Sequence, residues 1–248
     1  LKERAETGRI YLMNIDHCNS HSSFIDKVEM SNLCQEITLP TKPIQHIDDD
    51  SGEIALCILS AINIGKIRDV SDLKSLCDLS VRSLDELIDF QGYPVEAAEI
   101  ATKARRSLGI GYIGLAHYLA KQGVKYEDPK AWELVHDLTE AFQYHLIEST
   151  VNLAKEKGAC EYSDRTKYAQ GILPIDTYKK DVDELVPNNL KYDWETLRAL
   201  VKEHGVRNST LSAQMPSESS SVVSNATNGI EPPRGYLSIK KSKKGPLK

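Results

Sequence analysis

The stretch EIALCILSAINIG, residues 53–65, is the strongest indication of the fold class of this chain. Apolar residues fill both alternating sets of positions along it, a pattern typical of a strand covered on both faces. A buried helix has a similar composition, so that alternative stays open at this point. Because such strands occur in parallel sheets flanked by helices, the sequence predicts a helix-rich α/β fold.

Helical periodicity dominates the chain beyond this stretch. Apolar residues recur at spacings of three and four after a possible N-cap at Ser71. The longest such segment begins at Asp128-Pro129 and stops at Gly158, residue types that favour the two ends of a helix. The predicted helices comprise residues 70–90, 95–107, 129–157 and 193–204.

Three further segments give local predictions. Residues 9–15, RIYLMNI, resemble a buried strand. Residues 31–40 alternate apolar and polar side chains and end at a proline, which favours an extended segment. The serine-rich residues 217–228 contain Val222 and Val223, which favours an ordered loop followed by a short helix over a flexible linker.

Length and composition restrict the class of protein. With 248 residues, the chain can form one large or two small domains with a core that needs no disulfide or metal. The net charge of −5 argues against nucleic acid as the main partner. Five cysteines, an odd number without a secretory signal, favour a reducing compartment, and no apolar run is long enough to cross a membrane. We therefore expect a soluble cytoplasmic protein.

The two ends of the chain lack the usual signals of a complete protein. The first residue is Leu1, and residues 239–248 show no clear helix or strand pattern. We expect the chain to be a piece of a longer protein.

The most reactive combination of side chains lies in NLCQE, residues 32–36. In an extended segment, residues two apart point the same way, so Asn32, Cys34 and Glu36 would share one face. An amide, a thiol and a carboxylate would then lie within a few ångströms of each other. The alternative interpretation is a strand edge with a buried cysteine.

Two other segments could carry chemistry. Cys57 lies in an apolar run, where a cysteine commonly acts as a small buried hydrophobe, and a redox role requires a second thiol. In MPSESSS, residues 215–221, hydroxyls and backbone N–H groups at a helix start could bind a phosphate. Glu218 would then act through its backbone, since its carboxylate repels phosphate. A helix cap or a plain serine-rich loop is the alternative.

Two weaker patterns are assigned structural roles. GIGYIG, residues 109–114, has the glycine spacing of a dinucleotide fingerprint but follows a polar helical stretch, so a tight helix–helix turn is preferred. His17, Cys18 and His21 have plausible metal-ligand spacing, yet no distant Cys/His pair completes four ligands. We expect a structural turn there and no metal site.

These segments together resemble the large catalytic subunit of class I, aerobic ribonucleoside-diphosphate reductase, in its enterobacterial and phage form. The resemblance runs through the whole chain and corresponds to a central-to-C-terminal portion of the catalytic barrel. The matching segments are GRIY at 8–11, NLCQE at 32–36, LC at 56–57, RSLGIG at 106–111, GILPIDTYKK at 171–180, RNSTL at 207–211, MPSESS at 215–220 and NGIEPPRG at 228–235.

The resemblance implies a role for each candidate residue. In the family, the cysteine that matches Cys34 lies at the tip of a loop inside a ten-stranded α/β barrel. This cysteine becomes a thiyl radical, which abstracts the 3′-hydrogen of a ribonucleoside diphosphate. Glu36 is implied as general base, Asn32 as a ligand of the substrate hydroxyls, and Cys57 as one member of a redox-active pair. The implied diphosphate-binding loop consists of Pro216, Ser217, Glu218, Ser219 and Ser220.

The resemblance also implies partners. A metal-containing small subunit supplies the radical, thioredoxin or glutaredoxin restores the thiols, ATP and dNTPs act as effectors, and the full large subunit is dimeric. No cofactor or metal binds this segment directly. The second redox cysteine lies before Leu1 in the family, and none of Cys18, Cys77 or Cys160 matches it. We therefore expect residues 1–248 to form one segment of the barrel that is inactive alone.

Two other functions remain as alternatives. A glycyl-radical barrel enzyme shares a loop cysteine but carries a C-terminal glycine-radical segment, which this sequence lacks. A non-catalytic helical scaffold could bind a phosphorylated partner through its serine-rich loop. In that case Cys34 and Glu36 could be exchanged for Ser and Gln without functional loss.

Overall fold

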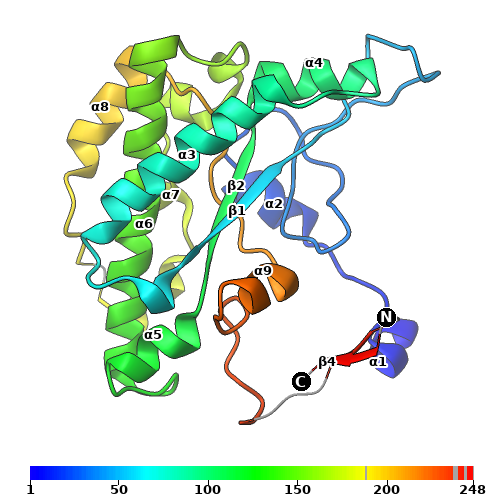
Figure 1. Cartoon of the computed structure of the whole chain (residues 1–248). Helices are drawn as coiled ribbons and strands as arrows, with labels where there is room; N and C mark the ends of the chain where they lie inside the picture. Colours follow the sequence, from blue (N-terminus) through cyan, green and yellow to red (C-terminus); the bar gives the residue numbers. More distant parts are fainter. Residues whose placement is uncertain (188, 237–239, 243–244, 248) are drawn as a thin grey trace.

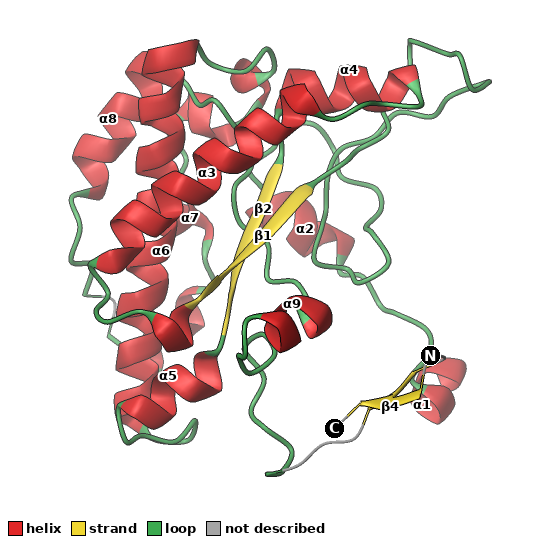
Figure 2. Ribbon diagram, viewed as in Figure 1, coloured by secondary structure: helices red, strands yellow, loops and turns green. Residues whose placement is uncertain are grey.

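Two parallel strands lie at the centre of the chain (Figures 1 and 2). The computed structural model describes residues 1–187, 189–236, 240–242 and 245–247. β1 (Ile58–Asn63) pairs with β2 (Leu108–Ile113) in the register Ile58↔Leu108 to Asn63↔Ile113. An extended segment, residues 210–213, continues the parallel arrangement on the other side of β2 through a bridge between Ile110 and Ser212. The predicted parallel α/β architecture is confirmed.

Helices cover one face of these strands. Ile110 and Tyr112 of β2 pack in the main core, where the ring of Tyr112 meets that of Phe142 edge-on at 5.3 Å. Figure 1 shows α3, α6 and α8 on this side of the strands, with α2 and α9 on the other. The larger helices are α3 (Asp72–Phe90), α4 (Glu96–Arg105), α5 (Leu115–Lys121), α6 (Pro129–Lys157) and α8 (Trp194–His204). Of these, α3, α4, α6 and α8 confirm the four helices predicted from periodicity.

Short elements complete the described part of the chain. The helices are α1 (Lys2–Thr7), α2 (Ile15–His21), α7 (Pro174–Thr177) and α9 (Glu218–Val223). A short helix is confirmed in the serine-rich region, but it lies within residues 217–228 and does not follow a loop there, so the predicted order is wrong. The 3-10 helices are η1 (Ile64–Lys66), η2 (Ser163–Arg165), η3 (Lys167–Gln170) and η4 (Lys180–Glu184). Near the C-terminus, where the sequence indicated no strand, β3 (Lys240–Ser242) and β4 (Gly245–Leu247) pair antiparallel.

The strand predicted for residues 9–15 is wrong. Ile10, Tyr11 and Leu12 are about half exposed, and Ile15 already begins α2. A strand needs a neighbouring strand to pair its backbone groups, and residues 9–14 have no strand partner among the described residues. The turn expected around His17, Cys18 and His21 is likewise wrong, because all three lie in α2.

The helix–helix turn preferred for residues 109–114 is also wrong. Leu108, Ile110 and Tyr112 alternate with Gly109 and Gly111, so one face of β2 is apolar and the other has almost no side chains. A Cβ atom on Gly109 would lie 2.8 Å from the sulfur of Cys57. The glycines therefore let neighbouring segments lie directly on the strand, a role of glycine in strands that the dinucleotide comparison overlooked.

The covering of β1 differs from the prediction. All of β2 is buried, whereas Leu59 on β1 is 44% exposed. The helices cover only one face of β1, so the opposite face is partly open. No helix among the described residues is both long and apolar enough to cross a membrane.

Candidate active site

The segment that carries Asn32, Cys34 and Glu36 is a turn, so the predicted extended conformation is wrong. The backbone N–H of Ile37 donates to the side-chain oxygen of Asn32 (3.1 Å), and the N–H of Asn32 donates to the carbonyl of Ile37 (3.1 Å). Gln35 has a left-handed backbone with φ of 63°. Asparagine side chains form such local bonds in place of a strand ladder. Cys34 is consequently exposed at the tip of the turn.

The turn brings Glu36 close to Cys57. One carboxylate oxygen of Glu36 is buried and has no hydrogen-bond partner among the described residues. Burial raises the pKa of the Cys57 thiol to about 12, and the negative charge of Glu36 contributes to the rise. Ile37 and Cys57 pack against the same small cluster of Phe24, Val28 and Leu39. A carboxylate and a protonated thiol, distant in sequence, are thus neighbours.

Alternation along β1 places Cys57 on the face that the helices do not cover. Side chains two residues apart share a face, so Cys57, Leu59 and Asn63 lie opposite the main core. Gly109 and Gly111 present the same face of β2. A Cβ on Gly109 would meet the Cys57 sulfur, and one on Gly111 would lie 2.9 Å from the Met215 sulfur. The two glycines are roughly 7 Å apart along the strand. Cys57 and Met215, which directly precedes the loop 216–220, therefore lie near each other.

The loop at residues 216–220 leads into α9. The buried Ser217 precedes the helix, but its hydroxyl donates to the carbonyl of Met215 (3.2 Å) and does not cap the helix. Asn228 holds the loop, since its side-chain oxygen accepts from the N–H of Ser217 (2.9 Å). The N–H groups of Ser219 and Ser220, in the first helical turn, have no intrahelical acceptor. These donors suit an anion.

Asn63 connects the open face of β1 to α9. Its side-chain nitrogen donates to the carbonyl of Ser224, the residue at the end of α9 (3.3 Å). Cys57 directly precedes β1 and Asn63 is its last residue, so the two lie at opposite ends of this face. The open face is therefore bounded by the Glu36–Cys57 pair at one end and by α9 at the other.

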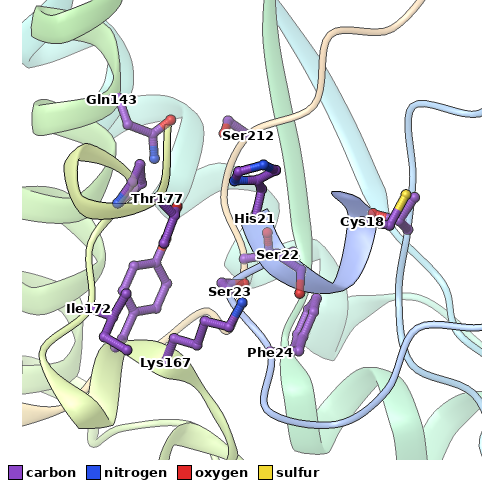
Figure 3. A pocket seen from close by; sticks show the side chains of 14 residues that line it. Cys18, His21, Ser22, Ser23, Phe24, Gln143, Lys167, Ile172, Thr177 and Ser212 are labelled. Atoms are coloured by element: carbon purple, nitrogen blue, oxygen red, sulfur yellow. The ribbon is translucent and has the colours of Figure 1, made fainter. Parts of the chain in front are cut away.

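A polar cavity of about 300 Å³ lies beside the extended segment at residues 210–213 (Figure 3). Figure 3 shows His21 and Lys167 among its side chains, with Ser212 from the extended segment beside β2. Thr38, which follows the turn around Cys34, also lines this cavity. The predicted site residues line none of the four cavities delineated in the described residues. Their convergence around a single cavity stays a prediction.

No group of three or more His, Cys, Asp or Glu side chains in the described part of the chain could hold a metal ion. The sequence interpretation also missed Gly109 and Gly111 as part of the site. The alternation LGIGYI in residues 108–113 is the signal that could have identified them.

Comparison with known proteins agrees with the resemblance. Residues 1–248 match the family model described as "Ribonucleotide reductase, barrel domain". The chain is 62% identical to the ribonucleoside-diphosphate reductase subunit alpha of Haemophilus influenzae, over 100% of this chain and 33% of that protein. It is 57% identical to the reductase 1 subunit alpha of Escherichia coli, with the same coverage. It is 46% identical to the subunit alpha of phage T4, over 99% of this chain and 32% of that protein.

The chain spans about a third of the length of these relatives. The family match covers the entire chain, including the Cys34 turn, Cys57 and the loop before α9. The expected resemblance is confirmed, and the chain belongs to the ribonucleotide reductase barrel-domain family.

Proposed function

We propose that this chain is one continuous segment of the catalytic barrel of a ribonucleoside-diphosphate reductase, in which it carries the hydrogen-abstracting thiol and half of the reducing dithiol. The proposal is supported by the packing of Cys57 and of Ile37, the neighbour of Glu36, on the same apolar cluster. There the charge of Glu36 acts on the Cys57 thiol, in a chain that matches the family throughout. Family membership favours this function over the glycyl-radical and scaffold alternatives.

Hydrogen abstraction falls to Cys34. The exposed turn presents its sulfur to a substrate. As a thiyl radical, the sulfur takes the 3′-hydrogen of the ribose, so an S–H bond forms as the C3′–H bond breaks. Glu36 accepts the proton of the 3′-hydroxyl, a role that fits its buried, unpartnered oxygen. Asn32 uses its side-chain oxygen within the turn, which leaves its NH₂ group to donate to the substrate hydroxyls.

Reduction falls to Cys57 and a second thiol outside this chain. The 2′-hydroxyl leaves as water, and the two thiols supply two hydrogen equivalents while one S–S bond forms. The reaction balances as ribonucleoside diphosphate plus dithiol giving deoxyribonucleoside diphosphate, disulfide and water. The raised pKa keeps Cys57 as a thiol, the form that donates hydrogen. Thioredoxin or glutaredoxin then resets the pair by thiol–disulfide exchange.

Diphosphate binding falls to the loop 216–220 and the start of α9. The N–H groups of Ser219 and Ser220, which have no intrahelical acceptor, and the positive end of the helix favour an anion. Binding energy from this remote group holds the ribose in register over Cys34.

Other polypeptide segments complete the site. Leu59 is 44% exposed on the open face, and among the described residues β1 pairs with β2 alone. Exposed apolar faces and unpaired strand edges favour association. The remaining large-subunit segments cover this face, a metal-containing small subunit delivers the radical to Cys34, and ATP and dNTPs regulate the dimeric cytoplasmic enzyme.

Reconstitution tests the proposal. The chain is placed in a complete large subunit and assayed with the small subunit, CDP and thioredoxin. We expect dCDP from the native sequence and loss of dCDP from Glu36→Gln. Glu29→Gln is the matched control, since Glu29 is an exposed carboxylate paired with Lys27. Equal turnover by the two variants, or no dCDP from the native assembly, would overturn the proposal.

A further inference from the structure

Arg105 holds both ends of the segment that carries the candidate catalytic turn. It is the last residue of α4, and its side chain is 3% exposed. Its Nε and Nη2 atoms donate to one carboxylate oxygen of Glu53 at 3.0 and 2.8 Å. Nη2 also donates to Asp26 at 2.9 Å. Asp26 precedes Cys34 in the chain, and Glu53 lies just before Cys57.

Further contacts close this segment at its base. Lys42 and Glu53 exchange two backbone hydrogen bonds of 3.0 and 3.1 Å, and the Lys42 ammonium lies 2.8 Å from the second carboxylate oxygen of Glu53. Arg165 pairs with Asp26 at 2.7 Å. The turn with Asn32, Cys34 and Glu36 is thus the part of the chain between two ion-paired anchors.

The environment of Arg105 favours a fixed geometry. Its guanidinium carbon lies 5.7 Å from the ring of Phe24 and 5.1 Å from that of Tyr162. Burial works to raise the pKa values of Asp26 and Glu53, but hydrogen bonds and charges from Arg165, Lys42 and Arg105 outweigh it and lower both. Both carboxylates are therefore ionised at neutral pH. A planar, forked guanidinium can bind two carboxylates at once, which a lysine ammonium cannot do with the same geometry.

We infer that Arg105 is a positioning residue that sets the placement of Cys34 relative to Cys57 by binding Asp26 and Glu53 with one guanidinium group. This inference rests on the proposed function, because it concerns two thiols that must act on the same ribose in succession. When the clamp loosens, Cys34 still reacts, but Cys57 no longer meets the intermediate in time. The substrate is then consumed without clean reduction.

The neighbouring Arg106 provides a matched control. It is 4% exposed and pairs with the buried Asp85 (2.6 Å) and with Asp89 (2.8 Å). Both carboxylates belong to α3. A lysine at either position removes a buried bidentate arginine, but only Arg105→Lys acts on the segment between Asp26 and Glu53.

Hydrogen–deuterium exchange tests the clamp without requiring activity. Relative to amides of α6, we expect Arg105→Lys to speed exchange in residues 27–41 by about tenfold, through local opening. We expect Arg106→Lys to leave this ratio unchanged. Asp26→Asn, at a carboxylate that is 27% exposed, provides a gentler variant and should give a smaller effect in the same direction. Equal ratios in the two lysine variants would overturn the clamp.

Product analysis in the complete assembly tests the catalytic consequence. We expect Arg105→Lys to lower the ratio of dCDP to decomposition products by about a hundredfold, the scale of a 1 Å misplacement. Arg106→Lys should lower total turnover at most and leave the ratio unchanged. A ratio that is equal in the two variants would overturn the positioning role. Absence of dCDP from the native assembly would instead refute the proposed function, while the exchange measurement would still decide whether the clamp exists.

Discussion

Replacing Gly111 by alanine should destabilise the chain and displace the loop before α9. A Cβ atom there would lie 2.4 Å from the carbonyl oxygen of Ala213 and 2.9 Å from the Met215 sulfur. A backbone oxygen cannot rotate away, so the segment beside β2 must move. Overpacking of this kind costs about 1–3 kcal/mol, and the loss of glycine freedom in the unfolded chain offsets roughly 0.4–1 kcal/mol. We expect a net loss of about 1.3 kcal/mol in the free energy of unfolding, from the difference between the midpoints of these two ranges.

Urea denaturation followed by circular dichroism measures this loss as a midpoint lowered by roughly 0.5–1 M. Gly92→Ala is the control, because no atom lies within 4 Å of its added Cβ, and it should leave the midpoint unchanged or raise it slightly. In the complete assembly, Gly111→Ala should also raise KM for CDP, since Met215 leads directly into the loop 216–220. Equal midpoints for the two variants would refute the close packing of residues 213–215 on β2.

Three other predictions follow from the site. At pH 8 about one Cys57 side chain in ten thousand is a thiolate, given a pKa of about 12. Iodoacetamide should therefore label the exposed Cys34 first, and Glu36→Gln should speed the labelling of Cys57. An unchanged labelling rate of Cys57 in this variant would contradict the proximity of Glu36 and Cys57. The folded-state pKa values of Asp26 and Glu53 are lowered, so their contribution to stability should be complete above their ordinary pKa values of 3.8 and 4.5 and lost as the pH falls through the folded-state values. When the urea midpoint is measured against pH, Asp26→Asn should make its fall at acidic pH less steep. An identical pH dependence in the variant and the native chain would refute this. The 248-residue chain with reductant alone should form no dCDP, and steady turnover under those conditions would show that Cys57 has another thiol partner in this chain.

Local sequence signals were sufficient for the elements with strong periodicity and clear ends. The structure places α6 at Pro129–Lys157, as the proline and Gly158 indicate, and Ile58–Asn63 forms a parallel strand, as its apolar run indicates. The ends of α6 require no information from distant residues, whereas the apolar run alone left a buried helix as an alternative for β1.

Elements shaped by distant contacts were not predictable in this way. Residues 108–113 follow a helix and contain two glycines, and their strand conformation depends on Cys57, Ala213 and Met215, which pack where side chains are absent. The turn around Cys34 depends on side-chain-to-backbone bonds of Asn32 that an alternating pattern does not reveal. The resemblance identified the candidate residues, but the ion pairs of Arg105 that anchor their segment became apparent only in the folded chain.

Single-turnover product analysis of two cysteine variants separates hydrogen abstraction from reduction. In the complete assembly, Cys34→Ser should leave CDP intact. A hydroxyl O–H bond is too strong to be broken in place of the thiol S–H bond, so no radical forms at this position to abstract the 3′-hydrogen. Cys57→Ser should still consume CDP but yield decomposition products in place of dCDP, because abstraction proceeds and clean reduction fails. The same product distribution from both variants would contradict the separate roles assigned to Cys34 and Cys57.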